Sequence, residues 1–182
     1  IEKTTIQIER DKANLERQMI ELEQKALRLQ MNPHFIFNAL NTIKGYYSEG
    51  DTINASSYIS KFSKLLRMLL ENTDQAIPLA NEIEMLALYV SLAQTRYKNK
   101  FDYELFVDEN LNVNEIIIPT LLLQPIVENA IIHGLAPKEN KGILKVYFVK
   151  KGKQLECIVE DNGIGRAASK SNQKFKEYES KA

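Results

Sequence analysis

A histidine and an asparagine stand four positions apart in the run MNPHFIFNALN, residues 31–41. Side chains four positions apart share one face of a helix, so His34 and Asn38 could act together at one surface. An unperturbed imidazole, with a pKa of about 6.5, is mostly neutral at neutral pH and can serve as a nucleophile. A single histidine in an apolar helix is more often a packed residue, and the run alone favours that interpretation.

A second group of polar residues stands in the run PTLLLQPIVENAIIHG, residues 119–134. Residues 120–133 are apolar almost all round, which predicts a buried helix. The amide oxygen of Asn129 would be costly there unless it met a hydrogen-bond donor or a cation, so it is a candidate metal ligand or a cap for nearby backbone. Glu128 precedes it. His133 follows one turn later, where it could contact a ligand or the last helical carbonyls.

The third candidate is Asp161, which opens the run DNGIG at the end of an alternating strand pattern. A carboxylate there can accept a hydrogen bond from the exocyclic amine of adenine. Gly163 and Gly165 would let the backbone approach a base closely. Asp-Asn-Gly is also ordinary turn chemistry, and taken alone the exposed turn is the better interpretation.

Apolar residues recur every seven positions in the first part of the chain, which is the pattern of a coiled-coil seam. The seam residues are Ile1, Ile8, Leu15, Leu22, Leu29, Ile36 and Ile43. They predict one helix from Ile1 to about Tyr47, roughly 70 Å long if unbroken. Because so narrow a stripe cannot be buried alone, we expect a parallel dimer. His34 and Asn38 fall outside the seam and would face outward, and Pro33 predicts a kink beside them.

A turn and a second helix follow this long helix. Gly50 and Asp51 mark the turn, and residues 54–72 form an amphipathic helix. Its apolar face consists of Ile59, Phe62, Leu66 and Leu69. We expect it to fold back on the first helix, so that two copies make a four-helix bundle. The polar segment 72–78 ends in proline and is the predicted linker between domains.

The remainder predicts a mixed α and β unit. A helix of about 20 residues begins at Leu79, and residues 101–107 alternate as a strand with one wet face. Residues 113–118 are a candidate strand, and Pro119 suits a helix start. Residues 144–149 and 155–160 alternate as strands joined in a hairpin at Lys151-Gly152-Lys153. The tail, residues 166–182, is polar without periodicity. The fold class is α+β, with helices on one face of a mixed sheet.

Composition excludes several classes of function. The 182 residues are 44% hydrophobic and 26% charged, as in a soluble globular protein. Lys plus Arg and Asp plus Glu number 24 each, so no global charge favours nucleic acid or an anionic membrane. The single Cys157 excludes an intrachain disulfide and a cysteine-based zinc site, and its strand pattern predicts a small core residue. We find no signal peptide and no apolar run long enough to span a membrane.

Three motifs together resemble one family. The run LQMNPHFIFNALNTI is similar to the phosphoacceptor box of the LytS-type (LytS/YehU) sensor histidine kinases. The runs PTLLLQPIVENAIIHG and VEDNGIG resemble that family's nucleotide-binding boxes, in the family's order. The resemblance covers residues 30–165, and three motifs in correct order are far more specific than any one alone.

The resemblance implies a fold and a domain division. Residues 1–75 would be a coiled coil and a dimerising phosphoacceptor hairpin. Residues 79–182 would be an ATP-binding α/β sandwich of the GHKL superfamily (gyrase, Hsp90 and histidine kinase). The family's further glycine box, which closes the lid over the phosphates, is not found before Ala182. We therefore expect an excised piece, truncated at the lid, of the cytoplasmic portion of a membrane-anchored bacterial sensor.

Roles for the motif residues follow from the same resemblance. His34 would accept phosphate from ATP, and Asn38 could orient water for dephosphorylating a regulator. Asn129 would coordinate the Mg2+ that bridges the ATP phosphates, which suits an ion that takes few protein ligands. Glu128 would be a positioning group, and His133 could contact the phosphates.

The adenine end of the site follows in the same way. Asp161 would accept the adenine amine, with Gly163 and Gly165 close to the base. At Pro125, related ATPases of the superfamily place an acid that activates water, so its absence favours transfer to a protein over hydrolysis. Phe35 stands where many histidine kinases have an acid, which leaves the proton acceptor of His34 unassigned.

The function implied is ATP-dependent phosphorylation of His34, followed by transfer to an aspartate on the receiver domain of a response regulator, often of the LytTR type. A rival is a dimeric signalling scaffold that binds nucleotide weakly or not at all, which the missing glycine box supports. A third possibility, an ATP-driven clamp, is disfavoured by Pro125. No direct contact with nucleic acid or membrane is expected.

Overall fold

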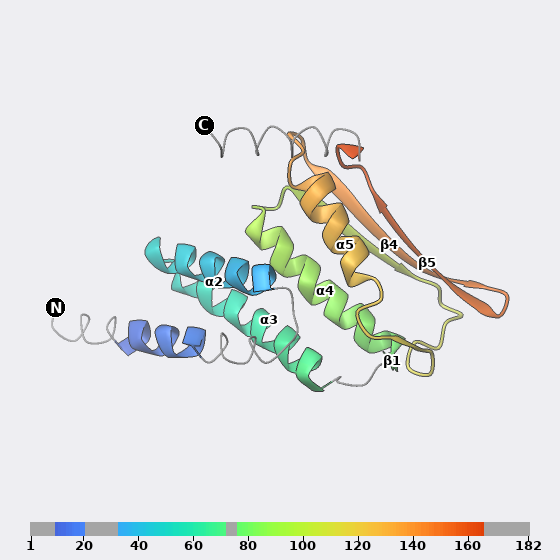
Figure 1. The fold of residues 1–182 in the computed structure, drawn as a ribbon, viewed down its shortest axis with the longest axis horizontal. Helices are drawn as coiled ribbons and strands as arrows, with labels where there is room; N and C mark the ends of the chain where they lie inside the picture. The colour runs from blue at the N-terminus through green and yellow to red at the C-terminus, as the bar shows by residue number, and fades with distance from the viewer. Residues whose placement is uncertain (1–9, 21–32, 72–75, 166–182) are drawn as a thin grey trace. The chain divides into compact units, whose positions relative to one another are not determined.

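The computed structural model describes residues 10–20, 33–71 and 76–165 of the chain, and the side chains of Pro33 and His34 lie outside that description. The chain divides into two compact units, Ile1–Thr73 and Asp74–Ala182. The first unit is helical in its described part, and the second combines helices with two sheets (Figure 1). This arrangement confirms the α+β class.

The first unit is built around a pair of helices, α2 (Pro33–Ser48) and α3 (Thr52–Glu71), which pack against each other. Gly50, at φ +74°, makes the tight turn between them. The Asp51 carboxylate accepts a hydrogen bond from the backbone N–H of Asn54 at 3.1 Å. This N-terminal cap explains why α3 begins two residues before the predicted start.

The buried face of this helix pair agrees with the apolar pattern. All four residues predicted for the face of α3 are buried: Ile59, Phe62, Leu66 and Leu69. The ring of Phe62 lies 5.7 Å from that of Phe35, and Ile36 and Ile43 of the seam are buried as well. Residues 10–20 are helical. The continuous helix from Ile1 to Tyr47 includes residues 1–9 and 21–32, outside the described residues, so it stays a prediction.

Three strands form the main sheet of the second unit, in the order β2 (Phe101–Val107), β4 (Gly142–Lys151) and β5 (Gln154–Asp161). β2 is parallel to β4, and β4 is antiparallel to β5. The sheet is therefore mixed, as predicted. Gly152, at φ +63°, lies in the predicted hairpin turn, where a left-handed conformation suits glycine.

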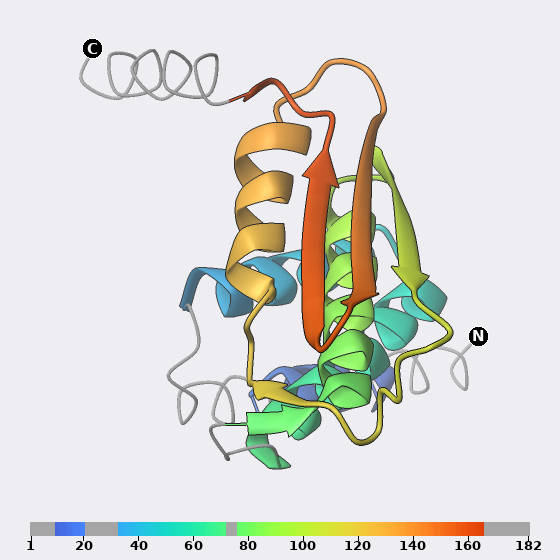
Figure 2. The same cartoon turned by 90° about the vertical axis from the view of Figure 1, so that its right-hand side faces the viewer.

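Helices cover one face of this sheet (Figure 2). They are α4 (Leu79–Arg96), α5 (Gln124–Asn129) and the π-helix η1 (Ala130–Leu135). In β4, Leu144, Val146 and Phe148 alternate as fully buried residues. On the opposite face Phe106 stacks on Tyr147 at 4.8 Å between ring centroids, and the side chain of Lys145 pairs with Glu104 at 2.9 Å. β2 therefore has the predicted polar face.

A second, two-stranded sheet corrects two predictions. β1 (Ala76–Pro78) pairs antiparallel with β3 (Ile117–Pro119), so the end of the predicted linker is a strand and Pro119 closes a strand instead of opening a helix. Residues 113–116 do not extend β3. The Ile116 and Val113 carbonyls instead accept hydrogen bonds from the N–H groups of Leu79 and Ala80, which begin α4. These bonds satisfy N–H groups that have no acceptor within the helix.

The predicted buried helix 120–133 is also wrong in part. It is replaced by a loop followed by α5 and η1, with Pro125 in the first turn of α5. Val127, Ala130 and Ile131 are buried, whereas Ile126 is 52% exposed. Cys157, predicted as a core residue, is only partly buried.

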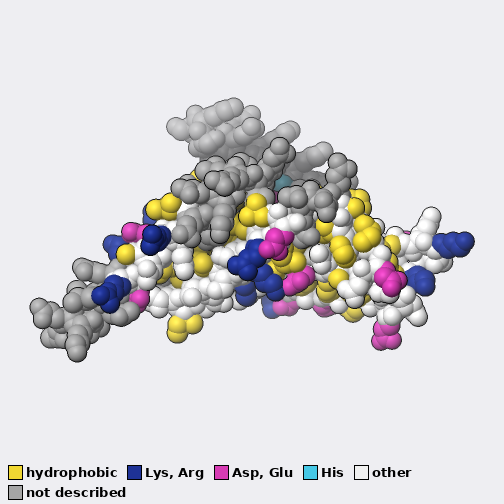
Figure 3. Space-filling view, turned by 90° about the horizontal axis from the view of Figure 1, so that it is seen from below, with side chains coloured by type: hydrophobic (Ala, Val, Ile, Leu, Met, Phe, Trp, Pro, Cys, Tyr) yellow, Lys and Arg dark blue, Asp and Glu magenta, His cyan; other side chains and the backbone are white. Residues whose placement is uncertain are grey.

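The surface agrees with the balanced composition. Side chains of both charge signs alternate with exposed apolar ones on the face seen in Figure 3. Within residues 10–20, 33–71 and 76–165, none of the helices combines the length and the apolar character needed to cross a membrane.

Candidate functional site

The helical segment that carries three of the predicted site residues changes type along its length. α5 ends at Asn129 and continues as η1, in which the Ala136 N–H donates to the Ile131 carbonyl, five residues back, at 2.8 Å. π-helical turns are rare and occur frequently at functional sites. This local widening therefore marks the segment as a candidate site independently of its sequence.

Asn129 and His133 are exposed on this segment, and Glu128 is partly buried. The prediction of a buried Asn129 is wrong, because the segment buries Val127 and Ile131 and leaves its polar positions outward. The desolvation argument for a metal therefore does not apply. Exposure instead makes the amide oxygen accessible to a ligand in solution.

The C-terminal end of η1 lies against the Asp161 turn, which brings two of the sequence motifs together. The Ile164 N–H donates to the Gly134 carbonyl at 3.0 Å. A Cβ on Gly163 would lie 2.5 Å from the backbone of Gly134, and a Cβ on Gly134 would lie 2.8 Å from Oδ1 of Asp161. At Gly163 the neighbouring atoms are backbone, so only glycine allows this approach, whereas at Gly134 the close neighbour is the Asp161 side chain.

Asp161 ends β5, as predicted, and is exposed. Its Oδ1 accepts the Gly163 N–H at 2.8 Å. A carboxylate has about four acceptor positions, so this internal bond leaves capacity for a ligand donor. The turn interpretation and the ligand interpretation are thus compatible. Gly165 has φ +78° and stands at the end of the described residues.

Asn162 fixes the same turn from its other side. Its side-chain Oδ1 accepts the Ile143 N–H at 2.8 Å, and its carbonyl accepts a hydrogen bond from Lys138 Nζ at 2.7 Å. Sequence reasoning missed this residue, although an asparagine between two candidate positions in a turn was a usable signal. The turn that carries Asp161 is therefore held by both η1 and β4.

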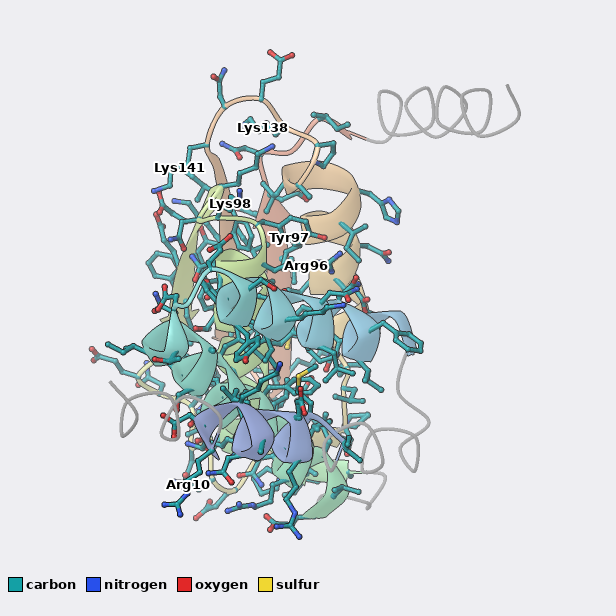
Figure 4. All side chains as sticks on the ribbon, turned by 90° about the vertical axis from the view of Figure 1, so that its left-hand side faces the viewer. Arg10, Arg96, Tyr97, Lys98, Lys138 and Lys141 are labelled. Carbon is teal, nitrogen blue, oxygen red and sulfur yellow. The ribbon has the colours of Figure 1, made fainter. Side chains whose placement is uncertain are left out.

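Basic residues gather at this end of the unit. Lys138 and Lys141 lie there (Figure 4). Lys100 Nζ donates to the carbonyls of Ala136 and Lys138 at 3.1 and 3.3 Å. Cations at the carbonyl end of a helix complement its dipole. The same charge would favour an anionic ligand near the Asp161 turn.

Glu128 faces the end of α4. Burial raises the pKa of Tyr97, the Arg96 charge lowers it, and the Glu128 charge raises it. The Arg96 guanidinium carbon lies 4.9 Å from the centre of the Tyr97 ring. Glu128 is therefore close enough to the end of α4 for its charge to act on Tyr97, and its role as a positioning group stays a prediction.

His34 and Asn38 belong to the first unit. His34 is the second residue of α2. Asn38 is partly buried, and its carbonyl accepts the Thr42 hydroxyl at 2.9 Å.

Within the described residues, the second unit brings Asp161 and Gly163 to the helix of Glu128, Asn129 and His133.

A buried carboxyl group that sequence reasoning missed lies at the other end of α5. Glu82 of α4 is 1% exposed and accepts hydrogen bonds from the backbone N–H groups of Leu121 and Leu123. An acid three residues after Leu79 and four before Leu86, at core spacing, was the available signal. Among the described residues no three His, Cys, Asp or Glu side chains group as metal ligands.

The class of protein is given by comparison with known families. The family model described as Histidine kinase matches residues 22–101. Sensor histidine kinase YpdA of Escherichia coli K12 is 35% identical over 162 residues, covering 87% of this chain and 28% of that protein. Sensor histidine kinase BtsS of the same organism is 35% identical over 156 residues, covering 86% and 27%.

A relative from a different organism carries the name of the family that the motifs resemble. Sensor protein LytS of Bacillus cereus is 32% identical over 161 residues, covering 87% of this chain and 27% of that protein. The chain belongs to the LytS-type sensor histidine kinases. It spans little more than a quarter of the length of these three relatives.

Among solved structures, the histidine kinase domain of the blue-light activated kinase EL346 from Erythrobacter litoralis is 18% identical, with a TM-score of 0.39. The alignment covers 85% of this chain and 74% of that chain. The likeness is weak, and the family assignment comes from the sequence relatives.

Proposed function

We propose that this chain is the catalytic core of a sensor histidine kinase, in which the second unit binds Mg·ATP and His34 receives its terminal phosphoryl group. The family membership supports this, and one structural observation carries it. The Asp161–Gly163 turn lies against Gly134, at the end of the helix on which Asn129 and His133 are exposed. The two boxes therefore form one continuous surface.

The residues present fit a magnesium nucleotide. The exposed amide oxygen of Asn129 would hold Mg2+, which takes oxygen ligands and completes its shell with water and phosphate. Bound Mg2+ would neutralise charge on the phosphates. Asp161 would accept the adenine amine through the acceptor positions that the Gly163 N–H leaves open. His133 would contact the phosphates.

In the transfer step, a nitrogen of neutral His34 would form a bond to the γ-phosphorus as the bond between that phosphorus and the bridging oxygen breaks. ADP would leave, and the imidazole proton would pass to solvent. The phosphoryl group would then move to an aspartate on the receiver domain of a response regulator, which in this family often carries a LytTR DNA-binding domain. Asn38, four residues from His34, would orient water for dephosphorylating that regulator.

The same proposal assigns the two units. Residues 1–75 would form the homodimer and present His34, and residues 79–182 would bind the nucleotide. Ile20, Phe37 and Ile53 are 56%, 56% and 82% exposed in the first unit, and such apolar side chains suit burial against a second copy. The relatives named as sensors support a place in the cytoplasmic portion of a membrane-anchored sensor.

Labelled ATP with Mg2+ tests the proposal directly. The protein should acquire an acid-labile, base-stable phosphoryl group, which His34→Gln abolishes. Asp161→Asn should also abolish it, whereas Asp102→Asn, at an exposed ion pair with Lys141, should not. A protein that takes no label would be the scaffold, and one that only releases free phosphate would be the clamp. Either result would overturn the kinase proposal.

A further inference from the structure

A carboxyl group is buried where α4 meets the loop before α5. Glu82 lies in the first turn of α4 and is the buried charged residue among those described, at 1% exposure. Removing a carboxylate from water is unfavourable unless strong hydrogen-bond partners replace the water. The partners of Glu82 therefore indicate what its burial achieves.

Those partners are consecutive backbone N–H groups. Oε2 of Glu82 accepts from Leu121 at 3.0 Å and Oε1 accepts from Leu123 at 3.2 Å, so each oxygen has its own donor. The Leu122 N–H contributes a third favourable interaction. Leu121 has φ +60°, whereas Leu123 is right-handed. A left-handed residue near right-handed ones directs successive N–H groups to one point and forms an anion-binding nest.

The nest is also the start of α5. Leu123 occupies the N-cap position, and no side chain of the segment itself caps the helix. Free N–H groups at a helix start require an acceptor, and here Glu82 supplies it from 41 residues earlier in the sequence. A leucine at positive φ is strained, and such strain persists only where the surroundings hold it. Glu82 therefore holds both the loop conformation and the origin of α5.

We propose that Glu82 is a positioning residue for the nucleotide site, which sets the start of α5 and thereby the place of Asn129. The inference rests on the proposed function, because Asn129 matters here as the group that holds Mg2+. Asp161 stands on a different element, β5, and its turn is fixed by Gly134, Ile143 and Lys138. Loss of the Glu82 anchor should therefore disturb the metal and phosphate end of the site more than the adenine end.

Binding of two ligands by the whole protein separates this role from a general effect on folding. We would titrate Mg·ATP and adenosine by calorimetry into the native protein, Glu82→Gln, and the control Glu84→Gln, an exposed position on the same helix. Loss of a buried charged acceptor should weaken Mg·ATP binding about tenfold in Glu82→Gln and leave adenosine binding within about twofold. The affinity of Glu82→Asp for Mg·ATP should lie between those of the native protein and Glu82→Gln, because this variant keeps a carboxylate on a shorter side chain. Equal weakening of both ligands, or unchanged Mg·ATP binding, would overturn the inference.

Amide hydrogen exchange provides a second measurement that uses no nucleotide. Peptides covering residues 119–129 should exchange faster in Glu82→Gln, while those from β4 and β5 keep the native rate. Acceleration spread evenly over the second unit, or none in residues 119–129, would contradict the proposal. If the native protein binds no Mg·ATP, the proposed function fails, and the exchange result still decides the role of Glu82.

Discussion

The two ends of the α5–η1 segment are held by opposite means. At the start, the buried carboxyl group of Glu82 supplies acceptors to the backbone of residues 121–123. At the end, the absence of side chains on Gly134 and Gly163 lets two backbones meet. One anchor depends on charge and the other on volume. The exposed Asn129 and His133 lie between them, so a precise site is built on an outward face without being buried itself.

The largest effect is expected from a substitution at the contact between Gly134 and Gly163. In Gly163→Ala the new Cβ would meet the Gly134 backbone at 2.5 Å, and backbone cannot rotate away as a side chain can. We expect a loss of about 2 kcal/mol or more in the free energy of unfolding, because overpacking forces backbone shifts. Nucleotide binding should be lost with it. Urea denaturation and calorimetry measure the two effects.

The matched control is Gly45→Ala in α2, where a Cβ meets nothing within 4 Å. An alanine inside a helix should stabilise by about 0.5–1 kcal/mol relative to glycine. If Gly163→Ala were as stable as the native protein, the close approach of the two motifs would not be what holds the Asp161 turn.

The charge-dependent anchor should respond to pH. Burial raises the pKa of Glu82 from its ordinary 4.5, and the N–H groups of Leu123, Leu121 and Leu122 oppose that rise. A carboxyl group with a raised folded-state pKa stabilises the protein fully below the unfolded pKa and loses that contribution as pH rises through the folded value. The free energy of unfolding of the native protein, minus that of Glu82→Gln, should therefore fall as pH rises above about 4.5.

Urea titrations at a series of pH values measure this difference. Burial, followed by the Glu82 charge, raises the pKa of Cys157 from 9.0, so this thiol does not titrate in the acidic range. Glu84→Gln, at an exposed position on the same helix, is measured in parallel. A difference that grows with pH would mean that the N–H groups stabilise the ionised form more than burial destabilises it.

The smallest effect is expected at Lys138, which contacts the turn that carries Asp161. Lys138→Gln removes the ammonium that donates to the Asn162 carbonyl at 2.7 Å, and with it a positive charge beside the Asp161 turn. We expect Mg·ATP binding to weaken about threefold and to depend less on salt, since exposed charges act through screened attraction. Lys141→Gln, whose partner is the exposed Asp102, is the control for charge alone. Equal effects of both variants would show that the contact with Asn162 has no separate role.

Periodicity correctly predicted the helices and strands whose buried and exposed faces follow from neighbouring residues in the sequence. β2 has the predicted bounds, α4 begins at the predicted Leu79, and the β4–β5 hairpin turns at Gly152. Asp161 stands at the end of a strand, as the alternation indicated. In the strands apolar and polar residues alternate, and in α4 apolar residues recur every three or four positions, so the neighbouring residues themselves carry the information.

Predictions failed where a partner distant in the sequence decided the outcome. Pro119 suited a helix start, but pairing with Ala76 placed it in a strand. Residues 120–133 are apolar on every side, so periodicity could not show that Ile126 and Asn129 would remain exposed. Glu82 was missed, because its meaning depended on N–H groups about forty residues later.

By itself the sequence determined the α+β class, the family, and the residue types available for phosphoryl transfer, because local patterning and ordered motifs are readable along the chain. Only the tertiary structure decided that Gly134 meets Gly163 and that Glu82 caps α5. Both contacts satisfy backbone groups through residues far away in the chain. Their energy depends on a spatial neighbour, which no spacing along the sequence specifies.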